Sequence, residues 1–161
     1  MTRPDDVDAI ARAIIGSSLY MVLGTGDEAG TPWVSPVWYA HDGPTTFYWV
    51  SSPDAKHSRN LAGRPEVSIV IFDSGAPISA GQAVYMSAVA EELGEDEADV
   101  AIEVFSRRSL VHGAGAWTLA NVLPPAALRL YRATASSQWI LEPGAPSDRR
   151  IEVHLGADGA A

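Results

Sequence analysis

The chain has 161 residues, 47% of them hydrophobic and 19% charged, which is typical of a globular protein able to bury a substantial core. The net charge of −9 argues against nucleic-acid binding, which depends on neutralising phosphates, and against a polybasic membrane surface. The absence of cysteine excludes disulfides and thiolate catalysis. With no spanning apolar run and no signal-peptide core at the N-terminus, a cytoplasmic location is expected.

The first third of the chain predicts a helix followed by strands. Residues 5–16 have apolar residues at helical spacing, and the apolar run 19–25 predicts a short strand. The segment 31–43 carries two prolines and is expected to be an edge or bulged strand. The aromatic run 45–52 follows, and we expect the two runs to pair as a hairpin.

The remainder predicts further strands and a second helix. Strands are expected at 67–73 and 82–93, and a helix with an acidic first turn at 94–109. Three more short strands are expected at LRLYRAT, SQWILE and RRIEVHL, and 155–161 is expected to be a disordered tail. No repeat or linker divides the chain, so we expect one domain, 1–161. Many short strands with few helices favour a mainly β, antiparallel barrel with peripheral helices.

The stretch SSPDAKHSRNLAGRP, residues 51–65, contains Lys56, the single lysine of the chain. Ser52 suits a helix N-cap and Pro53 the first helical position, and GRP ends the helix, so Lys56 is expected about one turn in.

Positive charge gathers in this stretch although the protein is acidic. No acid occurs in 55–65, which holds Lys56, His57, Arg59 and Arg64. Helix N-terminal amides, a hydroxyl and an ammonium together suit a phosphate. A solvated helix with neighbouring basic side chains is the alternative that the local pattern leaves open. For His57 the alternatives are a second anion contact and a surface residue.

The ordered motifs resemble the flavin-binding split β-barrels related to pyridoxamine 5′-phosphate oxidase, over residues 5–142. They are the strand GTPWVSPVWY, the run FYWVSSPDAKHSRNLAGRPEVSIVIFD, which is the most specific part, and a strand led by Gln82. The resemblance implies an antiparallel, FMN-binding type of split barrel that forms a homodimer with the cofactor at the subunit interface. It also implies an FMN-dependent oxidoreductase acting on an unidentified small molecule.

For the phosphate end of the cofactor, the resemblance implies contacts from Ser51, Ser52 and Lys56. Arginines that share this task in many relatives are missing from the strand WVSPVW, residues 33–38, where Trp33 and Ser35 occupy the candidate positions.

For the ring, the resemblance implies backbone contacts along the isoalloxazine from Ser35, Pro36 and Val37. Trp49 and Val50 would lie beneath the ring and the ribityl chain. Gln82 would reach the flavin, and Trp139 of the second subunit would cover it.

Other cofactors and roles remain open within this resemblance. A reductase using the deazaflavin coenzyme F-420, a flavin- or haem-binding module without turnover, and a barrel whose site has lost function are the alternatives. The four histidines show no metal-type spacing and no G-x-S-x-G motif is present, so no metal ligand and no catalytic acid, base or nucleophile is predicted.

Overall fold

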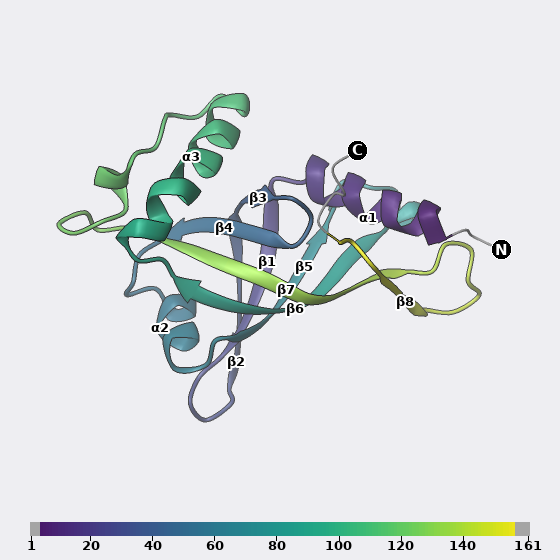
Figure 1. Cartoon of the computed structure of the whole chain (residues 1–161). Helices are drawn as coiled ribbons and strands as arrows, with labels where there is room; N and C mark the ends of the chain where they lie inside the picture. The colour runs from purple at the N-terminus through teal and green to yellow at the C-terminus, as the bar shows by residue number, and fades with distance from the viewer. Residues whose placement is uncertain (1–3, 157–161) are drawn as a thin grey trace.

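The computed structural model describes residues 4–156, and its eight strands form one antiparallel sheet (Figure 1). The strand order is β2-β1-β5-β6-β7-β4-β3, and β8 pairs with β7. The strands are β1 (Tyr20–Gly26), β2 (Pro32–Trp38), β3 (Ala40–Asp42), β4 (Thr46–Ser51), β5 (Glu66–Phe72), β6 (Ala83–Glu92), β7 (Arg129–Leu141) and β8 (Arg150–Val153). This is the predicted split β-barrel, mainly antiparallel with helices at its periphery.

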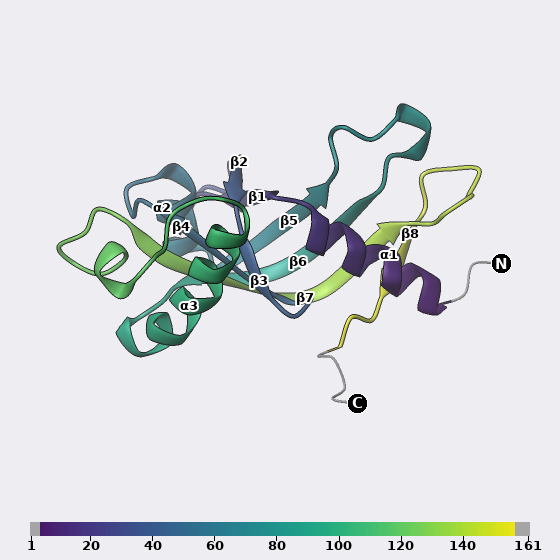
Figure 2. The ribbon, with the colours of Figure 1, turned by 90° about the horizontal axis from the view of Figure 1, so that it is seen from above.

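Three α-helices in the described part of the chain surround the sheet. They are α1 (Pro4–Ser17), α2 (Lys56–Gly63) and α3 (Glu95–Val111), and the short 3-10 turns η1 (Ile78–Ala80) and η2 (Leu119–Asn121) lie in loops. Figures 1 and 2 show α2 and α3 towards one end of the sheet, and α1 and β8 towards the other. None of these helices is both long enough and apolar enough to cross a membrane.

Two groups of buried side chains hold the helices on the sheet. In the main group, Val7, Ala11 and Ile15 of α1 pack against strand residues such as Leu23 and Ile69. Because these three α1 residues recur at a spacing of four, they form one apolar face of the helix.

The second group lies under α3 and adjoins the candidate site described below. It joins Ile102 and Phe105 of α3 to Tyr48 of β4 and Leu130 of β7. It thereby fixes α3 over β3 and β4.

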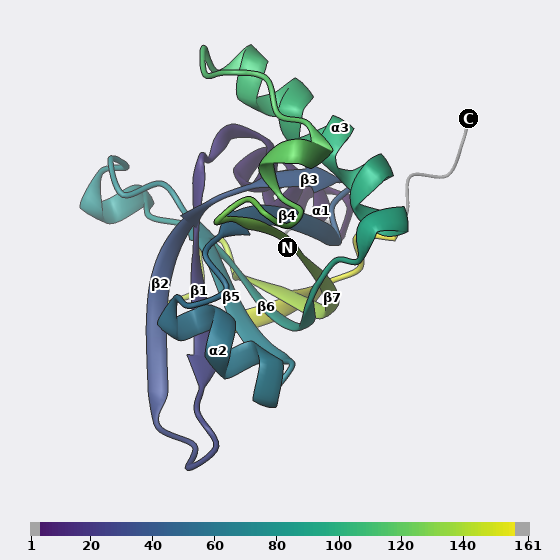
Figure 3. The same ribbon diagram turned by 90° about the vertical axis from the view of Figure 1, so that its left-hand side faces the viewer.

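The expected hairpin between 31–43 and 45–52 forms, but only through the last part of the first segment. The strand β2 pairs with β1, with Pro36 opposite Val22, and it is the short β3 that forms the hairpin with β4. Proline has no amide hydrogen to donate to a second neighbour, so β2 lies at the sheet edge, as its two prolines predicted (Figure 3). The buried Tyr39 separates β2 from β3, and its hydroxyl donates to the Ile15 carbonyl over 2.6 Å.

Two strands expected in the last third are one. LRLYRAT and SQWILE join in β7, whose pairing with β6 shifts register at Ser87/Ala88. Ser137 lies opposite Ser87 while Ala135 lies opposite Ala88, so Ser136 is the extra residue of a bulge. The polar Ser136 at this bulge interrupts the apolar pattern, which is why two strands were expected in place of one. In the expected tail, Leu155 is buried in the main core, and 157–161 lie outside the described residues.

Candidate functional site

A cleft of about 660 Å³ opens between β2, the β4–α2 junction, α3 and the loop that follows α3. Its wall on the α3 side is aromatic: Phe105 meets Trp38 edge to face at 4.9 Å and Trp117 at 5.4 Å between ring centroids. Leu19, Tyr20, Leu128 and Ala114 complete the apolar lining, together with the β2 and β4 residues discussed below. Flat apolar walls of this kind suit a planar ring system.

Hydroxyl and imidazole groups lie at one end of this cleft. The Ser51 Oγ is 2.8 Å from the His57 Nε2, and the His57 Nδ1 is 3.2 Å from the Ser35 Oγ. The Trp33 Nε1–H donates to the same Ser35 Oγ over 3.1 Å. His57 is 9% exposed, and its burial lowers the pKa of the imidazole, so the ring is neutral at pH 7. The surface-residue alternative for His57 is therefore wrong.

The helix α2 begins one turn later than expected. The Ser52 carbonyl accepts the Ala55 amide over 3.1 Å and its hydroxyl accepts the Asp54 amide over 3.1 Å, so 52–55 form a turn. Ala55 is the N-cap and Lys56 the first helical residue. Ser52 therefore stabilises this turn and does not cap the helix, because its hydroxyl bonds the amide two residues on, a local pattern that competes with helix.

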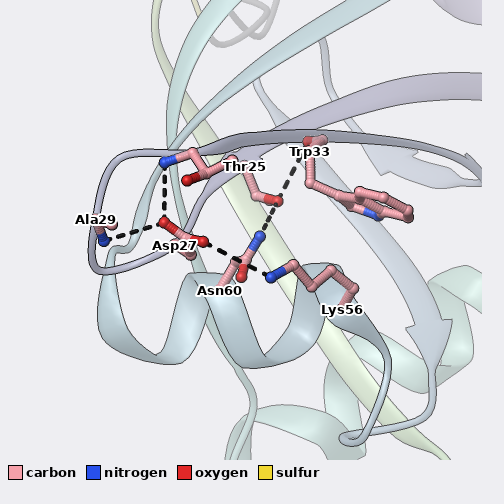
Figure 4. A network of polar contacts seen from close by, with 7 residues as sticks. Thr25, Asp27, Ala29, Trp33, Lys56 and Asn60 are labelled. Atoms are coloured by element: carbon pink, nitrogen blue, oxygen red, sulfur yellow. Dashed lines mark hydrogen bonds and ion pairs between the residues drawn. The ribbon is translucent and has the colours of Figure 1, made fainter.

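The side chain of Lys56 leans towards the β1–β2 turn (Figure 4). Its Nζ is 3.8 Å from the Asp27 Oδ2, and both side chains are partly exposed. Arg64 donates to the Glu28 carbonyl over 3.1 Å, in the same turn, whereas Arg59 donates to the Asp54 carbonyl over 2.5 Å. The basic stretch therefore attaches α2 to its neighbours, and its charges do not converge on one point.

Asp27 organises the turn that Lys56 reaches. Its Oδ1 accepts the amides of Thr31 at 2.8 Å and Ala29 at 3.0 Å, and Gly30 has the positive φ of 84° that closes the turn. The Thr31 amide bond chiefly, and the Lys56 charge to a smaller extent, hold the pKa of Asp27 below its ordinary value. The carboxylate is therefore ionised at neutral pH and competes for the lysine.

A buried contact next to this pair secures α2 against the β1–β2 hairpin (Figure 4). The Asn60 Nδ2 donates to the Thr25 Oγ1 over 3.0 Å, and that hydroxyl donates to the Trp33 carbonyl over 3.3 Å. Asn60 and Thr25 are both 6% exposed, so the backbone that places Trp33 against Ser35 is held from within.

Five of the residues predicted for the cofactor line the cleft: Pro36, Val37, Val50, Ser51 and His57. Ser35 joins them through its contact with His57. Ser52 and Lys56 lie at the same β4–α2 junction but outside the cleft lining.

Trp49 is not available to a ligand through its side chain. The indole is fully buried and stacks on Tyr131, with 5.5 Å between centroids and 16° between planes. Neighbouring residues of a strand point to opposite faces, so Val50 faces the cleft and Trp49 faces the core.

Gln82 and Trp139 lie apart from the cleft. The Gln82 side chain bonds the Leu141 backbone in both directions, over 2.8 and 3.0 Å. Trp139 is half-buried on β7 opposite Tyr85 and Glu152, towards β8. The chain therefore does not bring these two residues to its own cleft.

Some residues of the site were missed from the sequence. Phe105, His112 and Trp117 line the cleft, and Asp27 holds Lys56. The aromatic residues carry a weak signal, because Trp117 lies in an irregular segment where a large apolar residue needs a partner. Asp27 carries none, since its role depends on the register of β1 with β2. In residues 4–156, no group of His, Asp and Glu is arranged to hold a metal ion.

Solved structures with the same fold carry names of several kinds. A heme binding protein from Mycobacterium smegmatis aligns with a TM-score of 0.69 and 21% identity, over 95% of this chain and 58% of that one. The heme storage protein HutZ from Vibrio cholerae aligns at 0.61 and 20%, over 81% and 90% of the two chains. A protein named F420 Reductase aligns at 0.58 and 18%, over 79% and 94%. At these identities the likeness shows the fold alone.

Comparison with curated proteins finds no match. The family model described as pyridoxamine 5′-phosphate oxidase matches residues 7–137, which span α1 to the middle of β7. The match includes every residue that lines the cleft. The chain belongs to the pyridoxamine 5′-phosphate oxidase family.

Proposed function

We propose that this protein is an FMN-binding oxidoreductase that acts on a small molecule. The observation that carries the proposal is the cleft, which combines an aromatic and aliphatic wall with the hydroxyl and imidazole of Ser51 and His57 at one end. FMN has the complementary form, a flat apolar ring system with a phosphate at the end of a flexible chain. Family membership adds support, because the match spans the whole cleft.

In this proposal the residues of β2 and α3 hold the ring and those at the β4–α2 junction hold the phosphate. Pro36, Trp38 and Trp117 supply apolar walls, and Ser51, Ser52 and Lys56 supply hydroxyls and an ammonium. When bound, FMN supplies the hydride chemistry, and the protein binds and orients it and excludes water from the ring. Lys56 leaves Asp27 to bind the phosphate. This costs little because the Lys56–Asp27 ion pair has a long N–O distance and both side chains are partly exposed.

We propose further that the whole chain acts as one cytoplasmic split-barrel domain and as a homodimer. The outer face of the sheet exposes Tyr20, Val34, Phe72 and Val89, which are 45–66% exposed and apolar. Exposed apolar side chains gathered on one face of a sheet favour association. A partner covering this face would explain how Gln82 and Trp139 serve a cofactor, namely in the cleft of the other subunit.

The dimer is tested by Val34→Asp and Val89→Asp, which place charge on that face. Sedimentation velocity should show the wild-type protein as a dimer and the double variant as a folded monomer with weakened FMN binding. A wild-type protein that sediments as a monomer would contradict the dimer.

The cofactor is tested by titrating purified protein with FMN, riboflavin, the deazaflavin coenzyme F-420 and haemin. Quenching of flavin fluorescence should show saturable FMN binding at least tenfold tighter than riboflavin binding, because riboflavin lacks the phosphate. Oxidation of NADPH with a quinone acceptor then tests turnover. Saturable haemin binding without FMN binding would contradict the proposal.

Two other cofactors also have observations in their favour. His112 lines the cleft, so its imidazole would be available to ligate a haem iron, and two structures with this fold are named as haem proteins. This would be a binding module without flavin turnover. The structure named F420 Reductase favours the deazaflavin reductase. The titration separates all three, because free flavin, deazaflavin and haem differ in absorbance and fluorescence.

A further inference from the structure

Four side chains from β2, β4 and α2 form a continuous row of hydrogen bonds that ends in the cleft. Trp33 contacts Ser35, Ser35 contacts His57, and His57 contacts Ser51, at 3.1, 3.2 and 2.8 Å. Only Ser51 and His57 line the cleft, whereas Trp33 and Ser35 stand behind them. The row therefore connects an edge strand to one hydroxyl at the polar end of the cleft.

The chemistry of the first member favours one direction for the row. An indole N–H can only donate, so the Ser35 oxygen accepts from Trp33. Ser35 then has one hydrogen to give, and a hydroxyl whose oxygen already accepts is the stronger donor. The His57 Nδ1 lies within hydrogen-bond distance of this hydroxyl and can accept that hydrogen. A neutral imidazole that accepts at Nδ1 carries its hydrogen on Nε2, which then donates to the Ser51 oxygen.

The last hydroxyl is left with its hydrogen free. With the row in this direction the Ser51 oxygen accepts from His57, so its O–H is the one group of the row that can still donate, and Ser51 lines the cleft. The residues lining the cleft include no Asp, Glu, Lys or Arg within the described part of the chain, so no stronger polar group competes there. Burial of His57, which lowers its pKa, keeps the imidazole neutral at pH 7 as this direction requires.

We propose that Trp33, Ser35 and His57 are positioning residues that fix the Ser51 hydroxyl as a hydrogen-bond donor into the cleft. The site then selects a ligand group that presents an unprotonated oxygen, such as a phosphate ester, and disfavours one that presents only N–H or O–H donors. This inference rests on the proposed function, since it assigns the FMN phosphate as the acceptor. It also gives a role to Trp33 and Ser35, which stand where relatives carry arginines. These two residues orient the Ser51 hydroxyl and supply no charge.

The direction of the row is tested without any ligand by ¹⁵N NMR of histidine-labelled protein at neutral pH. Comparison with the spectrum of His57→Gln identifies the His57 signals. We expect a protonated Nε2 and an unprotonated Nδ1 in the wild-type protein, and loss of this bias in Ser35→Ala. A protonated Nδ1 in the wild-type protein would overturn the proposal, because Ser51 would then be donating to His57.

Its effect on binding is tested by titrating the same proteins with FMN. Ser35→Ala should weaken FMN binding about 3- to 10-fold, the value of roughly one hydrogen bond, and leave riboflavin binding unchanged. Ser74→Ala, in the exposed turn after β5, is the matched control and should bind FMN as the wild type does. Equal FMN affinity of Ser35→Ala and wild type would also overturn the positioning role.

The two proposals fail in different ways. If the wild-type protein has the expected tautomer but binds no FMN, the proposed function is wrong and the direction of the row stands. If it binds FMN with Nδ1 protonated, the proposed function stands and the positioning role is wrong.

Discussion

Replacing Lys56 by alanine tests whether the single lysine holds a phosphate or only attaches α2 to the β1–β2 turn. A charge-assisted contact to a phosphate is worth about 1.5–3 kcal/mol, or about 10- to 150-fold in Kd. Lys56 is 42% exposed and gives up Asp27 when it turns to a ligand, so we expect the lower part of this range, about 10- to 50-fold. Riboflavin affinity should not change.

The companion variant is Asp27→Asn, which removes the competing charge but keeps an oxygen for the Thr31 and Ala29 amides. Fluorescence titration should show FMN binding several-fold tighter than in the wild type. The double variant with Lys56→Ala should match Lys56→Ala alone, since Asp27 acts through the lysine. The reasoning is refuted if Lys56→Ala lowers the Tm and leaves the Kd for FMN unchanged, because the lysine would then only attach the turn.

Three further predictions concern the frame of the site. Tyr39→Phe removes the buried hydrogen bond to the Ile15 carbonyl and should lower the free energy of unfolding, measured in urea, by about 1–2 kcal/mol. The control Tyr20→Phe, at an exposed position, should leave it unchanged, and equal free energies of unfolding for the two variants would contradict the reasoning. Burial lowers the pKa of His57 in the folded protein, so as the pH falls below about 6.5 the unfolded chain takes up the proton first and the free energy of unfolding should decrease until the folded pKa is reached. His57→Gln should weaken this dependence of the free energy of unfolding on pH. An unchanged dependence would show that burial of His57 does not affect stability. Trp117→Ala should weaken FMN and riboflavin binding equally in calorimetry, because it removes a wall for the ring. A loss of affinity for FMN alone would instead place the phosphate beside Trp117.

Much of the fold follows from local patterns in the sequence. The prolines of β2 predict an edge strand, and the apolar spacing of Val7, Ala11 and Ile15 predicts α1 and its buried face. The segment 31–43 was expected to be one strand, but it divides at Tyr39 into β2, which pairs with β1, and β3, which pairs with β4. The sequence pattern does not mark this division.

The site is less accessible from sequence, because its contacts join distant segments. Ser51 and His57 were identified near one another along the chain, but the contact of His57 with Ser35 spans 22 residues and depends on how β2 passes α2. The role of Asp27 depends in the same way on the β1–β2 turn. Trp49 illustrates a different limit: whether it or Val50 faces the cleft is decided by one residue of strand register.

The most direct test of the account is a crystal structure of the protein with FMN. We predict the ring in the cleft between β2 and α3, against Trp117, and the phosphate accepting a hydrogen bond from the Ser51 hydroxyl with Lys56 turned away from Asp27. A flavin bound elsewhere, or bound in the cleft with its phosphate away from the β4–α2 junction, would contradict the account.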